Sequence, residues 1–307
     1  SSEIKKSLRL GLEVTDKFYK IAFIDVIIFC LPTPLKGNNI PDLSYIINTF
    51  NSINRFLRKN QAICLESTTY PGTSEEILEP RLKKKGYVLG KNYFLIYSPE
   101  RDDPGRKNIN NSLVPRIYSG KTLRCKEIGK ILYKQIFKKL VYMKDIKSAE
   151  MTKLYENIFR SVNIGMVNEM KKICQKMKLN IFDIIEAAST KPYGFYKFYP
   201  GPGLGGHCIP IDPFYLSWKA KQFNINANFI KLAGYINKSM PSWIVDRLIN
   251  YYKNSNKNIK NKKILILGVA YKKNINDTRE SPAFEIIKIL KQKYKAAVEY
   301  HDPFVPL

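Results

Sequence analysis

The sequence predicts an α/β protein: a doubly wound sheet, a helical segment built around one long helix, and the start of a second α/β unit. Short apolar runs of strand length alternate with amphipathic stretches of helical period up to about residue 145 and again after residue 262. Between these regions the period is helical. Because 307 residues exceed the usual size of one domain, we predict three domains, at 1–145, 146–240 and 241–307.

Five strands and three helices are predicted in the first domain, and the first twenty residues are expected to be irregular. The strands are expected at 25–31, 62–66, 93–97, 116–119 and 140–142, and the helices at 42–57, 74–84 and 122–136. Unalternating apolar runs such as 25–31 are typical of parallel strands covered on both faces. Ligands of doubly wound sheets bind beyond the carboxyl ends of the strands. The polar turns at 32–34, 67–73 and 98–100 are therefore candidate binding segments.

A long amphipathic helix is predicted from Ser148 to Met177, with apolar side chains three or four residues apart. This stripe indicates a core or a subunit interface. Lys153 and Asn157 project side by side from another face because they are four residues apart. Further helices are expected at 182–190, 213–222, 228–238 and 241–252, and a strand, helix and strand at 263–267, 282–293 and 298–300.

The segment 199–215 carries the strongest chemical signal. Four glycines within 201–206 remove the Cβ atoms that would keep a ligand from the backbone, and they permit positive φ. Such a loop can wrap an anion and then delivers Cys208 just before a helix, with Asp212 as the predicted N-cap and Pro213 as the first helical residue. A helix N-terminus lowers the pKa of a nearby thiol. Cys208 is therefore the predicted nucleophile, with a buried structural cysteine as the alternative.

Other interpretations of this loop are less favoured. Gly201, Gly203 and Gly206 match the G-x-G-x-x-G pattern of dinucleotide-binding turns, but no predicted strand precedes them and Pro202 interrupts the turn. His207 is an alternative general base, although neighbouring residues in a tight loop usually point apart. The chain has two histidines, so no metal site is expected.

Composition favours a cytoplasmic protein that binds small molecules. No run of 18 apolar residues occurs, so no membrane span is expected. The five scattered cysteines argue against a disulfide framework. The formal charge of +26 comes from lysines spread along the whole chain, which is typical of solvated helix faces and turns rather than of a nucleic-acid groove. Nucleic acid is therefore not expected as a principal partner, but the positive field attracts polyanionic small molecules.

Five segments, in order, resemble the UDP-glucose/GDP-mannose dehydrogenase family of nucleotide-sugar 6-dehydrogenases. They are Ser67-Thr68, Ser98-Pro99-Glu100, Lys153-Leu154-Tyr155-Glu156-Asn157, Gly203-Leu204-Gly205-Gly206-His207-Cys208 with Asp212, and Asp277-Thr278-Arg279-Glu280-Ser281. The resemblance implies a Rossmann-like first domain, NAD as cofactor, a UDP-sugar as substrate, and a role in polysaccharide biosynthesis. It also implies oxidation of a sugar C6 alcohol in two steps through a cysteine-bound thioester. A homodimer through the 148–177 helix is expected.

The resemblance implies a role for each matching residue. Cys208 resembles the nucleophile. Lys153 and Asn157 resemble donors to the developing oxyanion, Asp212 and Thr68 the pair that orders a catalytic water, and Glu100 the base of thioester hydrolysis. The implied substrate contacts are Phe198, Tyr199, Gly203, Gly205 and Lys272. The implied cofactor contacts are Leu31, Pro32, Thr33, Pro34, Thr68 and Arg279.

The chain also departs from the family pattern. A glycine fingerprint with its acidic ribose-binding residue is absent before Asp25, as is most of the UDP-binding domain, so we expect both ends of the family fold to be truncated. Pro104 stands where UDP-glucose enzymes carry a second glutamate. The amino-acid sequences of these motifs are most similar to those of the UDP-N-acetylglucosamine branch. UDP-N-acetylmannosamine and UDP-glucose remain alternative substrates, and an inactive dimeric binding or scaffold protein remains an alternative function.

Overall fold

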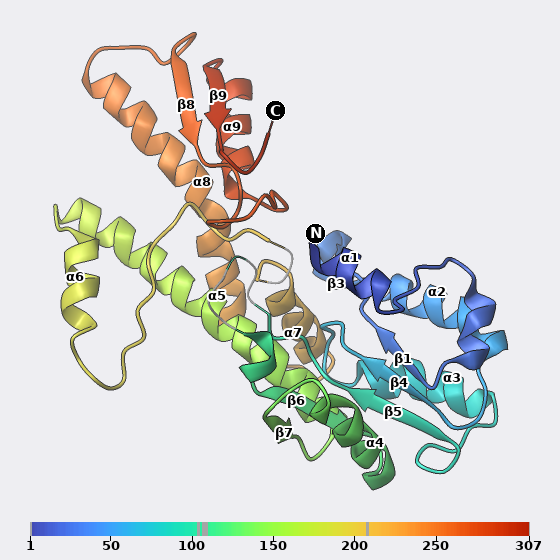
Figure 1. Ribbon diagram of the computed structural model, residues 1–307. Helices are drawn as coiled ribbons and strands as arrows, with labels where there is room; N and C mark the ends of the chain where they lie inside the picture. Colours follow the sequence, from blue (N-terminus) through green and yellow to red (C-terminus); the bar gives the residue numbers. More distant parts are fainter. Residues whose placement is uncertain (1, 103–104, 106–109, 207–208, 307) are drawn as a thin grey trace.

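The structure is a computed structural model that describes residues 2–102, 105, 110–206 and 209–306. A five-stranded sheet with its covering helices forms one part, long helices form the middle, and a small two-stranded sheet with one helix lies at the opposite end (Figure 1). This arrangement confirms the predicted fold class. Residues 103–104, 106–109 and 207–208, and with them Cys208 and Pro104, lie outside the described residues.

The large sheet has the strand order β1-β4-β5-β6-β7. Its strands are β1 (Val26–Phe29), β4 (Gln61–Leu65), β5 (Tyr93–Tyr97), β6 (Arg116–Gly120) and β7 (Leu140–Tyr142). The pairs β1/β4, β4/β5 and β6/β7 are parallel, as expected. β6, however, runs antiparallel to β5, with Ile96 opposite Gly120 and Tyr97 opposite Ser119.

The reversal at β6 was not predicted, and the connection explains it. A parallel return needs a crossover of a dozen or more residues, usually a helix. In the described part of 98–115 the only helical piece is the 3₁₀ turn η5 (Asn111–Leu113). In agreement with this, the first residue of β6 lies at the same end of the sheet as the last residues of β5.

The central strands are covered on both faces. Ile63 and Leu65 face one apolar cluster, whereas Cys64 faces another, because side chains alternate along a strand. The first cluster includes residues of α2 (Ser44–Ile53), η4 (Ser74–Leu78), α3 (Glu79–Lys84) and the long helix α5 (Ile146–Lys176). The second includes residues of α4 (Leu123–Lys134). Burial on both faces accounts for the unalternating apolar runs.

The N-terminal residues are more regular than predicted. They form α1 (Ser2–Arg9) and the 3₁₀ segment η1 (Phe18–Phe23) before β1. After β1, the short strands β2 (Leu35–Lys36) and β3 (Ile40–Pro41) pair across the turn η2 (Gly37–Asn39), and η3 (Asn54–Phe56) follows α2. Residues 1–20 therefore contain a helix where an irregular segment was expected.

The middle of the molecule is built on α5 (Ile146–Lys176), which begins where the Asp145 side chain accepts a hydrogen bond from the Ser148 N–H at 2.8 Å. α6 (Ile181–Ala188), α7 (Asp212–Lys221) and α8 (Asn228–Asn254) surround it, and α5 and α8 cross closely (Figure 1). At the crossing, a Cβ on Gly165 would lie 3.1 Å from the Ala233 Cα.

The prediction of two helices at 228–238 and 241–252 is wrong, because α8 continues through Pro241. Proline has no N–H to donate to the carbonyl four residues earlier. That carbonyl belongs to Asn237, and it lies against Gly203, whose Cβ would be 3.1 Å from it. Burial of Asn237 and Pro241 in the helix packing holds the helix through the proline.

The C-terminal unit consists of β8 (Lys263–Leu267), α9 (Pro282–Gln292) and β9 (Ala297–His301), with the two strands parallel. Its core includes Val245 and Ile249 from the second half of α8. α8 therefore belongs to the middle helices at one end and to the C-terminal unit at the other (Figure 1).

Candidate functional site

The turns after β1 and β4 lie side by side at the carboxyl ends of these parallel strands. The Ser67 hydroxyl accepts a hydrogen bond from the Leu31 N–H at 2.8 Å and donates to the Leu31 carbonyl. The buried Thr33 hydroxyl donates to the Thr68 carbonyl at 2.8 Å, and the Pro34 carbonyl accepts from Tyr215 at 3.2 Å. The residues expected at the cofactor, 31–34 and Thr68, are therefore held together.

Asn157 and Asp212 form a buried pair between α5 and the start of α7. The Asn157 side-chain amide donates to Asp212 Oδ2 at 2.5 Å, and Asp212 is only 2% exposed. Burial raises the pKa of the Asp212 carboxyl to about 7, although the bond from Asn157 and the charge of Lys153 act to lower it. Lys153, Asn157 and Asp212 thus form one group, which brings together three of the predicted catalytic residues.

Asp212 does not cap α7 as predicted. Ile211 occupies the N-cap position without a side-chain cap bond, and Asp212 is the first helical residue, followed by Pro213. The Asp212 carboxylate accepts a hydrogen bond from the Asn157 amide, which comes from another helix. The position therefore supplies a buried carboxyl to the site rather than a surface cap.

Glu150, one turn before Lys153 on α5, is a site residue that the sequence analysis missed. Its carboxylate accepts hydrogen bonds from the Gly72 N–H at 2.5 Å, the Ser74 N–H at 2.9 Å and the Ser74 hydroxyl at 2.7 Å. Burial raises its pKa to about 7. Glu150 thus ties the turn that follows Thr68 to the helix of Lys153 and Asn157, and only this long-range contact identifies it.

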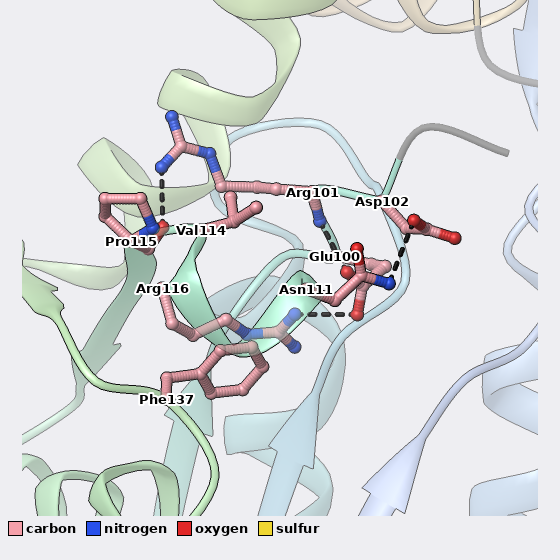
Figure 2. Close-up of a pocket in the computed structure, with 8 residues that line it drawn as sticks. All are labelled: Glu100, Arg101, Asp102, Asn111, Val114, Pro115, Arg116 and Phe137. Carbon is pink, nitrogen blue, oxygen red and sulfur yellow. Dashed lines mark hydrogen bonds and ion pairs between the residues drawn. The ribbon is translucent and has the colours of Figure 1, made fainter. Parts of the chain in front are cut away.

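Glu100 lies just beyond β5 and is bonded to an arginine. Arg116 Nη1 donates to Glu100 Oε2 at 2.7 Å, and the Arg101 N–H donates to Oε1 at 2.8 Å. Burial acts to raise the pKa of Glu100, but the bond and charge of Arg116 outweigh it and hold that pKa below its ordinary value. Figure 2 shows both side chains in a pocket that Asp102 and Phe137 also line.

The glycine loop is packed against the C-terminal unit. A Cβ on Gly205 would lie 2.5 Å from the Tyr271 Cβ, and Gly203 has a φ of 135°. The Gly206 N–H donates to the Arg279 carbonyl at 2.9 Å. Gly205 and Gly206 therefore allow close packing against Tyr271, whereas the sequence predicted that these glycines allow contact with a ligand.

The loop is also tied to both long helices. Asn168 of α5 accepts the Gly201 N–H at 2.9 Å and donates to the Asn237 side chain of α8 at 2.9 Å. These bonds place the segment that leads to residue 208 beside the crossing of the helices. Cys208 itself, the predicted nucleophile, and His207 lie outside the described residues.

The remaining predicted contacts lie in two other places. Phe198 packs on the cluster of Val167, Cys174, Ile181 and Ile185, and Tyr199 donates to Glu186 and stacks on Phe182. Lys272 lies in the turn after β8, and Arg279 is bonded to Asp277 with Nη2 2.6 Å from Oδ2. The structure thus holds Phe198 and Tyr199 beside α6, and Lys272 and Arg279 beside the glycine loop.

Two further findings concern metals and membranes. Within the part of the chain that the structure describes, no three His, Cys, Asp or Glu side chains are grouped so that they could hold a metal ion. No described helix combines the length and apolar character that crossing a bilayer requires.

Three family models match the chain, all from the UDP-glucose/GDP-mannose dehydrogenase family. The NAD binding domain matches residues 2–137, the central domain residues 147–239, and the UDP binding domain residues 265–307. Among the curated relatives, a UDP-N-acetyl-D-mannosamine dehydrogenase of Methanococcus vannielii is 36% identical over 91% of this chain. The chain spans 62% of the length of that relative.

Other relatives are similar over almost the whole chain. A UDP-N-acetyl-D-glucosamine 6-dehydrogenase of Pseudomonas aeruginosa is 31% identical over 99% of this chain and 72% of its own length. The solved structure of a UDP-D-ManNAc dehydrogenase from Pyrococcus horikoshii matches with a TM-score of 0.93 and 32% identity, over 99% of this chain and 72% of that chain.

Proposed function

This chain belongs to the UDP-glucose/GDP-mannose dehydrogenase family, and we propose that it oxidises the C6 alcohol of a UDP-N-acetylhexosamine to the uronic acid, with NAD as the hydride acceptor. The observation that carries the proposal is the buried pair of Asn157 and Asp212 beside the half-buried Lys153, which combines a cation, an amide donor and a carboxyl that titrates near neutral pH. Such a set can stabilise an oxyanion and pass a proton.

The turns at 31–34 and 67–68 fit a nicotinamide cofactor, because they lie at the carboxyl ends of neighbouring parallel strands and present hydroxyl and backbone groups there. When bound, NAD would accept one hydride in each of the two oxidation steps, so that one substrate uses two NAD molecules in turn. Thr33 and Ser67 hold the two turns together, so that the chain has a fixed edge against which the cofactor can lie.

The chain's own residues account for the remaining steps. The Cys208 thiolate adds to C6 of the aldehyde, and loss of hydride from the adduct leaves a thioester, whose C–S bond water then cleaves to give the carboxylate and the thiol. Lys153 and the Asn157 amide face the oxyanion of the adduct. Asp212 and Thr68 order the attacking water, Glu100 takes its proton, and Asp212, whose pKa is about 7, can give a proton to the leaving thiolate.

Cysteine labelling tests the nucleophile without any turnover. We expect iodoacetamide at neutral pH to alkylate Cys208 at least tenfold faster than Cys30. Cys30 is an exposed residue, but partial desolvation of its thiol and then the charge of Glu66 raise its pKa. Cys125, which is buried, serves as the unreactive control. Equal labelling of Cys208 and Cys30 would contradict the assignment.

The substrate branch is decided by steady-state kinetics. The sequence analysis favours UDP-N-acetylglucosamine, and the relative of Pseudomonas aeruginosa supports it, whereas those of Methanococcus vannielii and Pyrococcus horikoshii support UDP-N-acetylmannosamine. We expect one of the two N-acetyl sugars to exceed UDP-glucose at least tenfold in kcat/KM, which is about 1.4 kcal/mol. A preference for UDP-glucose would contradict the branch.

A dimer through the 148–177 helix is part of the proposal. The first half of the apolar stripe, Leu154 and Ile158, packs in the core, whereas Met166, Met170 and Met177 remain exposed, with Met177 at 62%. Light scattering should report a dimer, and a double change of Met170→Glu and Met177→Glu should give a monomer. An intact dimer that forms no NADH with any UDP-sugar would instead favour the binding or scaffold function.

A further inference from the structure

The reversal of β6 puts an arginine opposite the predicted base. In the antiparallel pair β5/β6 the residue numbers of partners add to a constant, since Ile96 faces Gly120 and Tyr97 faces Ser119. The same register carried to the end of β5 sets position 100 against position 116. A parallel β6 would have put Arg116 at the far end of the sheet, away from the polar turns.

Arg116 is a buried cation at the carboxyl ends of β4 and β5. It is only 2% exposed, yet each of its side-chain nitrogens has a partner. Nε donates to the Ser98 hydroxyl at 2.7 Å, Nη1 to Glu100 at 2.7 Å, and Nη2 to the Ser98 carbonyl at 3.1 Å. Nη2 is also 2.7 Å from Glu66 Oε2. A buried guanidinium that is bonded in this way has one orientation.

Two aromatic rings and a second carboxylate hold the guanidinium in place. The Tyr133 hydroxyl of α4 donates to Glu66 Oε1 at 2.7 Å, and the Arg116 guanidinium carbon lies 5.3 Å from the Tyr133 ring centre and 5.0 Å from that of Phe137. Figure 2 shows Phe137 beside the guanidinium, with Glu100 at the other end of the dashed bond. Glu66 and the two aromatic rings thus restrict the orientation of the Arg116 guanidinium.

The Glu100 side chain, in contrast, reaches outward. It is 57% exposed, although its bonded partner is buried. A surface glutamate without such an anchor would sample many rotamers. Here one oxygen is fixed by Arg116 and the other by the Arg101 N–H, so the carboxylate is presented at the edge of the sheet in a defined position.

We propose that Arg116 is a positioning residue for the reaction: it holds the Glu100 carboxylate at the carboxyl end of β5, and Glu66 with Tyr133 holds Arg116. The proposal rests on the proposed function, since a fixed base matters only if a thioester is hydrolysed. A lysine at 116 would keep the charge, but its single nitrogen cannot span Ser98, Glu66 and Glu100 as the guanidinium does.

Other charged groups surround the cluster and must be considered in any titration. They come from five segments: Cys30 after β1, Glu66 after β4, Arg101 after β5, Tyr133 on α4, and Glu156 of α5, which pairs with Arg101. Arg101 bonds Glu156 and the Pro115 carbonyl through its side chain, so its guanidinium is committed away from Glu100. Arg116 is therefore the side chain whose replacement should act most directly on Glu100.

The test compares Arg116→Gln and Arg116→Lys with the surface control Arg124→Gln, in which only a pair on α4 is lost. Glutamate labelled with ¹³C at the side-chain carboxyl reports the titration of Glu100, which Glu100→Gln assigns. In Arg116→Gln we expect this titration to move to higher pH and kcat for the UDP-sugar to fall at least tenfold, with KM changed less than threefold. Arg116→Lys should restore the titration in part and kcat only slightly.

Each outcome decides the proposal. A Glu100 titration that is the same in wild type and folded Arg116→Gln overturns it, as does full activity of that variant in an active enzyme. If Arg116→Gln fails to fold, Tyr133→Phe, which removes one hydroxyl and keeps the ring, should shift the Glu100 titration in the same direction by a smaller amount, and no shift overturns the proposal. A shifted titration in a chain without turnover supports the placement by Arg116 and counts against the proposed function alone.

Discussion

Asp212 and Glu100 are two of the predicted catalytic carboxyls, and their environments drive their pKa values in opposite directions. Asp212 is buried and bonded to an amide, so burial prevails and raises its pKa to about 7. For Glu100 burial also acts upward, but a guanidinium in direct contact prevails and lowers the pKa. A carboxyl therefore ionises readily when a cation is bonded to it, as at the partly exposed Glu100, and resists ionisation when it is buried with a neutral bonded partner, as at Asp212.

The two carboxyls are therefore suited to different tasks. A group with a pKa of about 7 can give and take protons at neutral pH, whereas one held below its ordinary pKa stays ionised. Glu150 belongs with Asp212, because its partners are neutral donors and burial raises its pKa as well. The carboxyls with raised pKa values, Glu150 and Asp212, thus lie on or against α5, whereas Glu100 lies in an ion pair at the edge of the sheet.

The largest effect is expected for Asp212→Asn. Because the folded-state pKa is raised from 3.8 to about 7, the contribution of Asp212 to stability is fully present below about pH 4 and is lost as pH rises through 7. Asparagine stays neutral, so the stability of the variant relative to wild type should rise by about 4 kcal/mol between pH 4 and pH 8. Urea unfolding at both pH values measures this difference. A difference in stability that is the same at pH 4 and pH 8 would contradict the raised pKa of Asp212.

Glu150→Ala should have the next largest effect. The change removes the acceptor of three buried donors on Gly72 and Ser74 and leaves them unpaired. We expect a loss of about 3 kcal/mol in the free energy of unfolding. Glu150→Gln keeps one acceptor oxygen but turns an NH₂ group toward one of these donors, so it should lose less than Glu150→Ala, about 2 kcal/mol at neutral pH. Equal losses in the two variants would show that the bonds to the turn do not matter.

Gly205→Ala tests whether the glycine loop packs closely against the C-terminal unit. The new methyl group would lie 2.5 Å from the Tyr271 Cβ and 3.1 Å from the Glu280 carbonyl, so the loop must shift, at about 2 kcal/mol. Gly201→Ala is the matched control, since its Cβ would meet nothing within 4 Å. Thermal unfolding should separate the two variants, and equal midpoints would argue against close packing of the loop.

Asp145→Asn should have the smallest effect. Asp145 caps α5 from an exposed position, and the Ser148 N–H is the main cause of its lowered pKa. Asparagine is also a good N-cap, so the loss should be below about 1 kcal/mol. The pKa of Asp145 is already below 3.8, so the loss should stay constant between pH 5 and pH 8 in the urea series. A loss that changes between pH 5 and pH 8 would mean that the exposed Asp145 titrates in the same pH range as the buried Asp212.

The sequence predicted local features well and long-range ones poorly. Strands 93–97, 140–142 and 263–267 have the expected bounds, because their apolar runs end in polar residues. The side-by-side placement of Lys153 and Asn157 followed from helical period alone. The direction of β6 and the partners of Arg116 did not follow, since they depend on a register between strands. Glu150 was missed for the same reason, as its partners are more than 70 residues away.

A single titration shows whether Asp212 and Glu100 have opposite pKa shifts. Aspartate and glutamate labelled with ¹³C at the side-chain carboxyl are followed from pH 3 to pH 9 in the wild-type chain, with Asp212→Asn and Glu100→Gln to assign the two signals. The account predicts that Asp212 titrates near 7 and Glu100 below its ordinary 4.5. Titration of Asp212 near 3.8, or of Glu100 above 4.5, would contradict it.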